Sequence, residues 1–431
     1  MIQTVFLLLF LPLFFSQLKK NTKMYGGANL FSAFCFSYFL YYILMPFLVY
    51  IFSRFDVETY NVFNTLYNNG RNKLPWVVYY LMIFITFFFV CNFYRNYRPS
   101  TKGINVRKFE KIIRYGAYIS LILGAFGFVM YIGALGGLSA ALAKAEYARS
   151  FGTDMMAEIG AANRYMIVAK LLLLSPYCSL FVYLKDRSIK NLVMIIVSVV
   201  LFILFQLVMA SRAPIIVLLI AFSFPLIAKR FKRPWLIIIL ASVLGSEILT
   251  FLDALFIYFD TGELEMEEAS PTAILRNFFH PVHNALYAFD MVRVYGIRFG
   301  QDFFTAVLDL VPGLDFSKSY EVPGAYFRGV DWKMTGGTPC DFITFSIIEF
   351  HVVGLIFMPY VVSIILKKGD LFLRRLSEVH SNSQLVVIYK TGLMLLIYGL
   401  VSSSDFSQVV GNYSLFFYFT AILISFKKVI K

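Results

Sequence analysis

Two histidines and an arginine lie close together in one polar segment of the chain. Residues 276–284 read Arg-Asn-Phe-Phe-His-Pro-Val-His-Asn, which places Arg276, His280, His283 and Asn284 within one short stretch. Imidazole exchanges protons near neutral pH, and arginine offers phosphate a planar fork of donors. This segment could therefore activate a hydroxyl group while arginine holds a leaving diphosphate. The alternative is an interfacial amphipathic turn with solvated imidazoles.

Further arginines occur in the polar segments that the topology below places outside the membrane. They are Arg54, Arg71, Arg149, Arg164, Arg276, Arg293, Arg298 and Arg328. Lys and Arg are normally enriched on the cytoplasmic side, so an outer array is unexpected. Such an array suits an anionic, membrane-tethered substrate such as a lipid diphosphate, although some of these arginines could simply anchor at lipid headgroups.

Arg212 interrupts an apolar stretch of almost 40 residues, within Ala-Ser-Arg-Ala-Pro at positions 210–214. Pro214 can begin the next helix, so the stretch predicts a tight turn at the outer surface. A charge in that position is costly unless it is paired or faces a polar cavity. Substrate binding and a structural ion pair are both open for Arg212.

Ionisable residues also fall inside apolar segments. Glu349 and His351 lie 8 to 10 residues into one of them, so both are expected to face the protein interior or a wet cavity. Lys170 and Glu247 lie within two others. A Lys–Glu pair between helices is the structural explanation for these groups.

Several common catalytic signatures are missing from the sequence. We find no D-x-D, H-E-x-x-H, Walker A or G-x-S-x-G motif. The four cysteines have no spacing that indicates a disulfide framework or a zinc site. We therefore expect no metal and no cofactor.

The elements that must position these residues are membrane-spanning helices. The chain has 431 residues, of which 59% are hydrophobic, and its mean hydropathy is +0.72. Apolar runs of about 17 to 25 residues recur and lack the alternation of a barrel strand. Inside lipid, each such run must satisfy its own backbone hydrogen bonds, so the fold class is all-α.

We predict a single polytopic domain over 1–431 with about eleven spans. The net charge of +14 arises mostly in short basic loops that alternate along the chain, which is the positive-inside pattern rather than a sign of nucleic-acid binding. The N-terminus is expected outside, and the first span is expected to be retained rather than cleaved. The predicted spans are 2–18, 28–52, 76–94, 113–135, 164–184, 191–209, 213–228, 235–257, 341–366, 384–401 and 407–426.

This topology leaves three long segments outside, at 53–75, 136–163 and 258–340. The last is the largest and contains the histidine segment and several arginines. Pro and Gly residues punctuate it, so it is expected to fold as a re-entrant or interfacial segment with turns.

With these residues assembled, the chain resembles the oligosaccharide repeat-unit polymerases, the Wzy-type O-antigen polymerases of bacteria. Three places carry the resemblance: the Ser-Arg-Ala-Pro turn at 211–214, the His283-Asn284 step in the large outer loop, and Thr-Gly-Gly-Thr-Pro at 335–339 leading into a helix with Glu349 and Gly354. The family's usual Phe-Gly step reads Phe-His-Val-Val-Gly at 350–354 here.

The resemblance implies a multi-pass protein of the bacterial inner membrane with a large periplasmic loop at 258–340. The implied activity is transfer of a glycan from undecaprenyl diphosphate onto the next lipid-linked repeat unit, without a metal. It further implies His280, His283, Arg276 and Glu349 as catalytic residues. Substrate would be bound by Arg212, Arg293, Arg298, Arg328, Arg149 and Asn284.

Two other functions remain open at this stage. An O-antigen ligase would use the same donor with a lipid A-core acceptor, and the His-Asn step does not separate it from a polymerase. A flippase or transporter would need charged residues along a path through both leaflets, whereas these candidates lie towards the outer face. The expected partners are the undecaprenyl-diphosphate-linked oligosaccharide and membrane lipids, with a chain-length regulator and a flippase of the same pathway as further candidates.

Overall fold

The computed structural model of the chain is all-helical over the residues that it describes. These are 2–25, 29–52, 74–96, 106–143, 162–209, 271–308, 319–328, 340–379 and 400–404, together with the isolated positions 214–215, 218–219, 222, 254 and 258. No strand occurs within these ranges. The predicted helical class is therefore confirmed for this part of the chain.

Five of its helices are long and apolar enough to cross a membrane. They cover Leu30–Leu48, Pro75–Asn96, Ile113–Ala134, Ile189–Val208 and Phe342–Leu371. Each coincides with a predicted span, and together they indicate a membrane protein. The predicted span 2–18 lies in α1 (Ile2–Tyr25) and the predicted span 164–184 is divided among α9 (Ala162–Ala169), η2 (Lys170–Leu173) and α10 (Ser175–Lys185), and neither is among these five helices. The predicted spans 213–228, 235–257, 384–401 and 407–426 lie largely or wholly outside the described residues, so the total of eleven and the orientation stay predictions.

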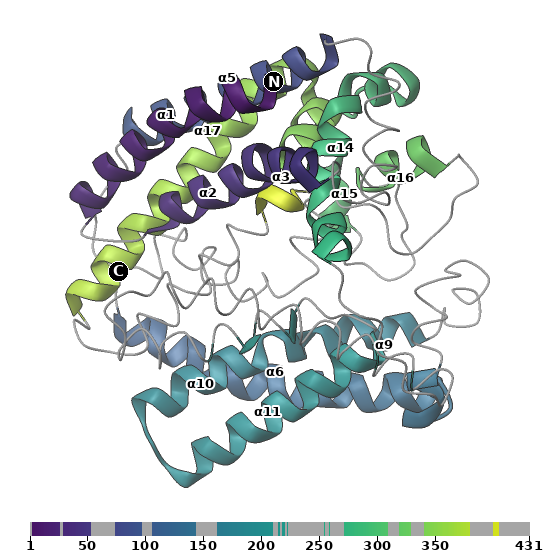
Figure 1. Ribbon diagram of the computed structural model, residues 1–431. Helices are drawn as coiled ribbons and strands as arrows, with labels where there is room; N and C mark the ends of the chain where they lie inside the picture. The colour runs from purple at the N-terminus through teal and green to yellow at the C-terminus, as the bar shows by residue number, and fades with distance from the viewer. Residues whose placement is uncertain are drawn as a thin grey trace.

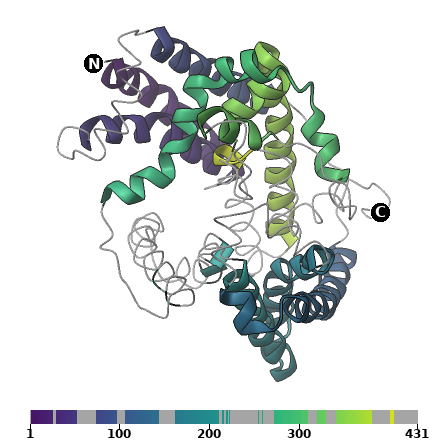
Figure 2. The ribbon, with the colours of Figure 1, turned by 90° about the vertical axis from the view of Figure 1, so that its right-hand side faces the viewer.

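The described helices form two groups, which we name after their buried polar residues (Figures 1 and 2). The carboxylate bundle has α17 at its centre, against α5, α14 and α2. In the serine bundle, α6 packs against α9 and α10, and α10 packs against α11. The carboxylate bundle consists of α1 (Ile2–Tyr25), α2 (Leu30–Phe39), η1 (Leu40–Leu44), α3 (Met45–Phe52), α5 (Leu74–Asn96), α14 (Pro271–Tyr295), α15 (Gln301–Leu308), α16 (Glu321–Arg328) and α17 (Phe342–Val379). The serine bundle consists of α6 (Val106–Ala134), α9 (Ala162–Ala169), η2 (Lys170–Leu173), α10 (Ser175–Lys185) and α11 (Ile189–Val208).

A carboxylate from the far end of the chain caps the start of α2. Asp370 on α17 accepts hydrogen bonds from the backbone N–H groups of Leu30 (2.7 Å) and Phe31 (3.4 Å), and from the Tyr94 hydroxyl (2.7 Å). The first N–H groups of a helix have no partner within the helix, and a carboxylate there also complements the helix dipole. Asp370 thereby joins α2, α5 and α17 at one end of the bundle.

A single π-helical turn, η1, lies between α2 and α3. Such turns are uncommon and are frequent at functional sites. The Tyr42 carbonyl of this turn accepts a hydrogen bond from the Tyr79 hydroxyl of α5 at 3.0 Å. The turn thus directs one backbone group and the Tyr42 side chain into the bundle interior.

The helix α17 is broken at His351, whose backbone angles are φ 54° and ψ −144°. This conformation is sparsely populated by residues other than glycine, and it separates α17 into segments 342–350 and 352–379. The two segments meet so closely that a Cβ on Gly354 would overlap the Ser346 carbonyl. Glycine is required at 354 because only a residue without a side chain permits this approach.

The serine bundle also uses glycine for close packing, but it buries only neutral polar groups at its centre. A Cβ on Gly127 of α6 would lie 2.6 Å from the Ala169 backbone nitrogen of α9. The Ser198 hydroxyl lies 2.9 Å from both the Ser175 and Ser179 hydroxyls. The outward faces of α6 and α11 carry exposed aliphatic and aromatic side chains, as expected for lipid contact: Ile119, Ile122, Leu123, Phe126, Val129, Val193, Ile196, Val197 and Val200.

Candidate functional site: a buried ionic centre beside a histidine-bearing helix

Glu349 forms a buried ion pair at the break in α17. Its Oε1 lies 3.2 Å from Nε of Arg298, and the side-chain exposures are 0% for Glu349 and 11% for Arg298. The prediction that Glu349 faces the interior is confirmed. His351, by contrast, is exposed and lies where the chain leaves helical geometry, so the structure does not place it in the protein interior.

The broken helix also supplies the backbone contact that holds Arg298 in place. The N–H of Arg298 donates to the carbonyl oxygen of Ile348 at 3.0 Å. In an unbroken helix that carbonyl would bond to the N–H four residues ahead, but the break at His351 intervenes. The segment that carries Arg298 therefore docks on α17 through a main-chain bond and an ion pair.

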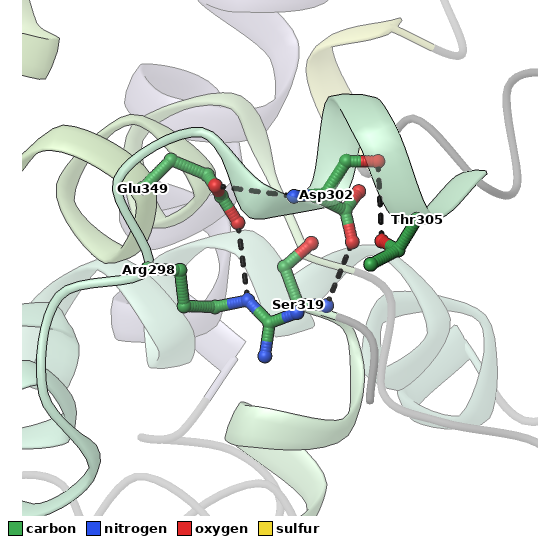
Figure 3. A network of polar contacts seen from close by, with 5 residues as sticks. All are labelled: Arg298, Asp302, Thr305, Ser319 and Glu349. Carbon is green, nitrogen blue, oxygen red and sulfur yellow. Dashed lines mark hydrogen bonds and ion pairs between the residues drawn. The ribbon is translucent and has the colours of Figure 1, made fainter. Parts of the chain in front are cut away.

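Asp302 extends the centre into α15 and towards α16 (Figure 3). Glu349 Oε2 accepts a hydrogen bond from the Asp302 backbone N–H at 3.4 Å, so Glu349 also caps the start of α15. The Asp302 Oδ1 accepts from the Ser319 N–H at 3.0 Å, just before α16 begins. Glu349, Arg298, Asp302 and Ser319 form what we call the ionic centre.

The ionic centre fixes the orientation of one guanidinium. The edge of Arg298 that bears Nε faces Glu349, whereas its terminal nitrogens extend away from that carboxylate (Figure 3). An ion pair with so little solvent exposure is a strong electrostatic element, because surrounding protein screens it less than water does. The arrangement fixes the position of the Arg298 guanidinium, and a cation held in this way can bind a phosphate or another anionic group.

His280, on α14, contacts the segment near the end of the described chain. Its Nε2 lies 3.0 Å from the Ser402 carbonyl oxygen, and its ring centroid is 6.4 Å from that of Tyr41. A carbonyl can only accept, so Nε2 carries the proton in this contact. In the neutral ring Nδ1 then holds the lone pair, so Nδ1 is the atom that can accept a proton.

His283, one turn further along α14, has a different environment. Its ring stacks on Phe327 of α16 with centroids 3.9 Å apart and planes 18° apart. Burial lowers the pKa of this imidazole to about 4, because desolvation disfavours its charged form. His283 is therefore neutral and weakly basic near pH 7, which does not suit the predicted role of a proton-accepting catalyst.

A second polar contact in the carboxylate bundle lies at the first turn of α17. The Tyr42 hydroxyl donates to Asp341 Oδ1 at 2.5 Å, and the same oxygen accepts the N–H groups of Ile343 and Thr344 at 3.1 and 3.2 Å. The Tyr42 hydroxyl also lies 3.5 Å from the Val401 carbonyl, one residue before the partner of His280. Asp341 thus links η1 to the start of α17, and Tyr42 lies between this carboxylate and the 400–404 segment.

The other predicted residues are not all brought together. Arg293 is 83% exposed and pairs loosely with Asp290 at 3.9 Å, while Asn284 is fully buried in α14. Arg276 and Arg328 lie on α14 and α16, but their side chains fall outside the described part of the structure. Arg149 and Arg212 lie outside the described residues altogether.

The sequence offered little sign of three residues that the structure adds. Asp302 and Ser319 belong to the ionic centre, and Asp341 binds Tyr42. Asp302 lies four positions after Arg298, a spacing that could have indicated a shared helical turn, yet Arg298 lies before the turn at 299–300 and α15 begins only at Gln301. Ser319 and Asp341 have no comparable local pattern.

No cluster that could hold a metal ion occurs within the described ranges, where a group of at least three His, Cys, Asp or Glu side chains was sought. Comparisons of this chain with protein families, with curated proteins and with solved structures found no match.

Proposed function

We propose that this chain is a surface-polysaccharide polymerase of the bacterial inner membrane. It would join undecaprenyl-diphosphate-linked oligosaccharide repeat units at the periplasmic face. The observation that carries the proposal is the ionic centre, in which Glu349 holds Arg298 within 3.2 Å at the break of an apolar helix. The same helix bears the Glu and Gly positions that carry the resemblance to the Wzy-type polymerases.

The reaction divides its tasks between a cation and a proton acceptor. The bond between the donor sugar's anomeric carbon and the diphosphate oxygen breaks, and the electron pair leaves with the diphosphate. Arg298 would stabilise that developing charge, with Arg276 as a second candidate. Glu349 acts as a positioning residue, because it touches Arg298 through Nε.

The acceptor sugar's hydroxyl oxygen forms the new glycosidic bond and must lose its proton. His280 is the better candidate to accept it, since its contact with Ser402 leaves Nδ1 with the lone pair of the neutral ring. His283 is assigned no proton transfer, because burial holds its pKa at about 4.

A reconstituted reaction tests this proposal. Purified protein in detergent is supplied with undecaprenyl-diphosphate-linked repeat units, and the products are separated by size. We expect a ladder of lengthened glycans from the wild type, loss of at least 100-fold in rate for His280→Ala, and a rate near wild type for His283→Phe. No ladder from the wild type, or a wild-type rate from His280→Ala, contradicts the respective assignment.

A transporter of lipid-linked glycan is the second candidate, because α17 is interrupted within an apolar span. Discontinuous helices with charged groups at the break are common around the substrate sites of secondary transporters. Elongation in detergent, where there are no compartments, excludes a purely transporting protein. The glycans of a deletion strain separate a ligase from a polymerase. Deletion of a ligase leaves bare lipid A-core, whereas deletion of a polymerase leaves core bearing a single repeat.

A further inference from the structure

Four aromatic rings from α14 and α16 gather into one cluster, which we call the aromatic patch: His283, Tyr287, Tyr326 and Phe327. The Tyr287 ring lies edge-on to both His283 and Phe327, with centroids 5.6 Å apart in each case. Tyr326 lies 5.1 Å from Phe327 and 6.0 Å from Tyr287. The neutral state of His283 lets its ring act as a fourth aromatic surface.

The rings are neither sealed in the core nor fully exposed, since all four are half-buried. An exposed ion pair lies beside these rings. Asp290, one helical turn after Tyr287 on α14, lies 3.9 Å from Arg293, and the side-chain exposures are 52% for Asp290 and 83% for Arg293. Both charges act on the Tyr326 phenol, whose pKa is raised by burial and then by Asp290, while Arg293 lowers it. The patch therefore combines aromatic surface with a nearby carboxylate and guanidinium.

This composition differs from the lipid-facing surfaces of the same protein. The outward faces of α6 and α11 carry side chains such as Ile122, Phe126 and Val197, without an ion pair among them. Neither α14 nor α16 belongs to the described helices that are apolar enough to span a membrane. Contact with lipid therefore explains the apolar faces of α6 and α11, but it does not explain the aromatic patch, where tyrosine hydroxyls lie beside a charged pair.

A sugar ring matches these features. One face of a pyranose presents C–H bonds, which pack against the electron-rich face of an aromatic ring, while its hydroxyl groups point outward around the edge. A carboxylate accepts hydrogen bonds from such hydroxyls and a guanidinium donates to them. We propose that the aromatic patch, with Asp290 and Arg293, is a saccharide-binding subsite for the glycan chain.

The position of the subsite relates it to the ionic centre. Ser319 bonds to Asp302 two residues before α16 begins, and Tyr326 and Phe327 lie at the other end of that helix. Eight helical residues span about 12 Å, so α16 connects the two sites across a distance of a few sugar units. This inference rests on the proposed function, because it takes the glycan of that reaction as its ligand.

Direct binding of a free saccharide tests the subsite without requiring catalysis. The probe is the oligosaccharide pool released by mild acid from the lipid-linked glycan of the cells that make this protein. Its affinity for the purified full chain is measured by calorimetry, with size-exclusion profiles to establish that each variant is folded. We expect Tyr326→Ala to weaken binding by about tenfold, which is the loss of roughly 1.4 kcal/mol.

Two matched variants sharpen the test. Tyr326→Phe keeps the ring and should stay within about threefold of wild type, whereas Tyr115→Ala removes an exposed tyrosine from α6 and should leave binding unchanged. Wild-type affinity in Tyr326→Ala, an equal loss in Tyr115→Ala, or no saccharide binding by the wild type overturns the subsite. Saccharide binding without elongation of lipid-linked units would instead reject the polymerase and leave the subsite standing.

Discussion

The two helix bundles place different polar groups in their interiors. At the centre of the serine bundle, the Ser198 hydroxyl contacts those of Ser175 and Ser179 and donates a hydrogen bond to the Met194 carbonyl at 2.7 Å. The carboxylate bundle contains four buried carboxyl groups, on Asp302, Asp341, Glu349 and Asp370. Ionisable groups within a membrane protein are expensive and tend to mark functional sites. The difference therefore favours the carboxylate bundle as the place of a functional site.

Gly354→Ala should give the largest effect, because the new methyl group would overlap the Ser346 carbonyl, which is part of a helix backbone and has little freedom to move. We expect a loss of more than about 5 kcal/mol in the free energy of unfolding. Fluorescence-detected size exclusion and thermal unfolding in detergent measure it. Gly133→Ala on α6 is the matched control, since its methyl group would meet open space. Equal melting temperatures for the two variants would refute the close approach in α17.

Glu349→Ala should follow, at about 3–5 kcal/mol, because it leaves the Arg298 guanidinium without its buried partner. Replacing both residues with apolar ones, as in Arg298→Met with Glu349→Leu, should recover most of that loss. The exposed pair offers the contrast: Arg293→Ala should change stability by no more than about 0.5 kcal/mol. A Glu349→Ala variant as stable as Arg293→Ala would mean that the ionic centre is solvated.

Ser198→Ala probes the serine bundle and should have a smaller effect. It removes the hydroxyl that Ser175 and Ser179 share, but no charge is left unpaired. Hydrogen bonds between helices in membranes contribute roughly 0.6 kcal/mol on average and up to about 1.7. Unfolding in mixed micelles measures the change. A loss as large as that of Glu349→Ala would remove the distinction between the bundles.

His283 should show the smallest effect near neutral pH, and its contribution to stability should become visible only as the solution is made acidic. Its pKa is lowered to about 4, so the folded state favours the neutral ring and the unfolded chain binds the proton more readily. The contribution of His283 to the free energy of unfolding is fully present above about pH 6.5 and is lost as the pH falls towards 4. His283→Phe should remove that decline. An imidazole NMR titration with a midpoint near 6.5 would contradict the buried environment.

The sequence predicted the spans better than it predicted the site. Hydropathy alone located the five described spans, because length and apolar content determine which segments enter lipid. It also placed Glu349 in the interior. It named Arg298 only as one of several arginines for substrate binding and did not predict its pairing with Glu349, because that pairing depends on how residues 296–302 dock against the break in α17.

The break in α17 could not be predicted from the sequence for a related reason. Gly354 was visible as a glycine within an apolar helix, but the left-handed residue is His351, three positions earlier. No local pattern identifies which residue will adopt that conformation, and the close approach of Gly354 to Ser346 that accompanies it is visible only in the fold. Tyr42 was equally hidden, because the chain has 28 tyrosines and only the fold brings one to Asp341.

The Asp370 cap on α2 has a consequence for how the protein is made. The backbone N–H of Leu30 and its acceptor are separated by 340 residues. At about 5–20 residues per second, a ribosome needs roughly 20–70 s to reach Asp370 after Leu30 has emerged. During that interval the start of α2 must rely on water, on lipid headgroups or on the insertion machinery. The carboxylate bundle can therefore close only late in synthesis, whereas α6 to α11 of the serine bundle can assemble while translation continues.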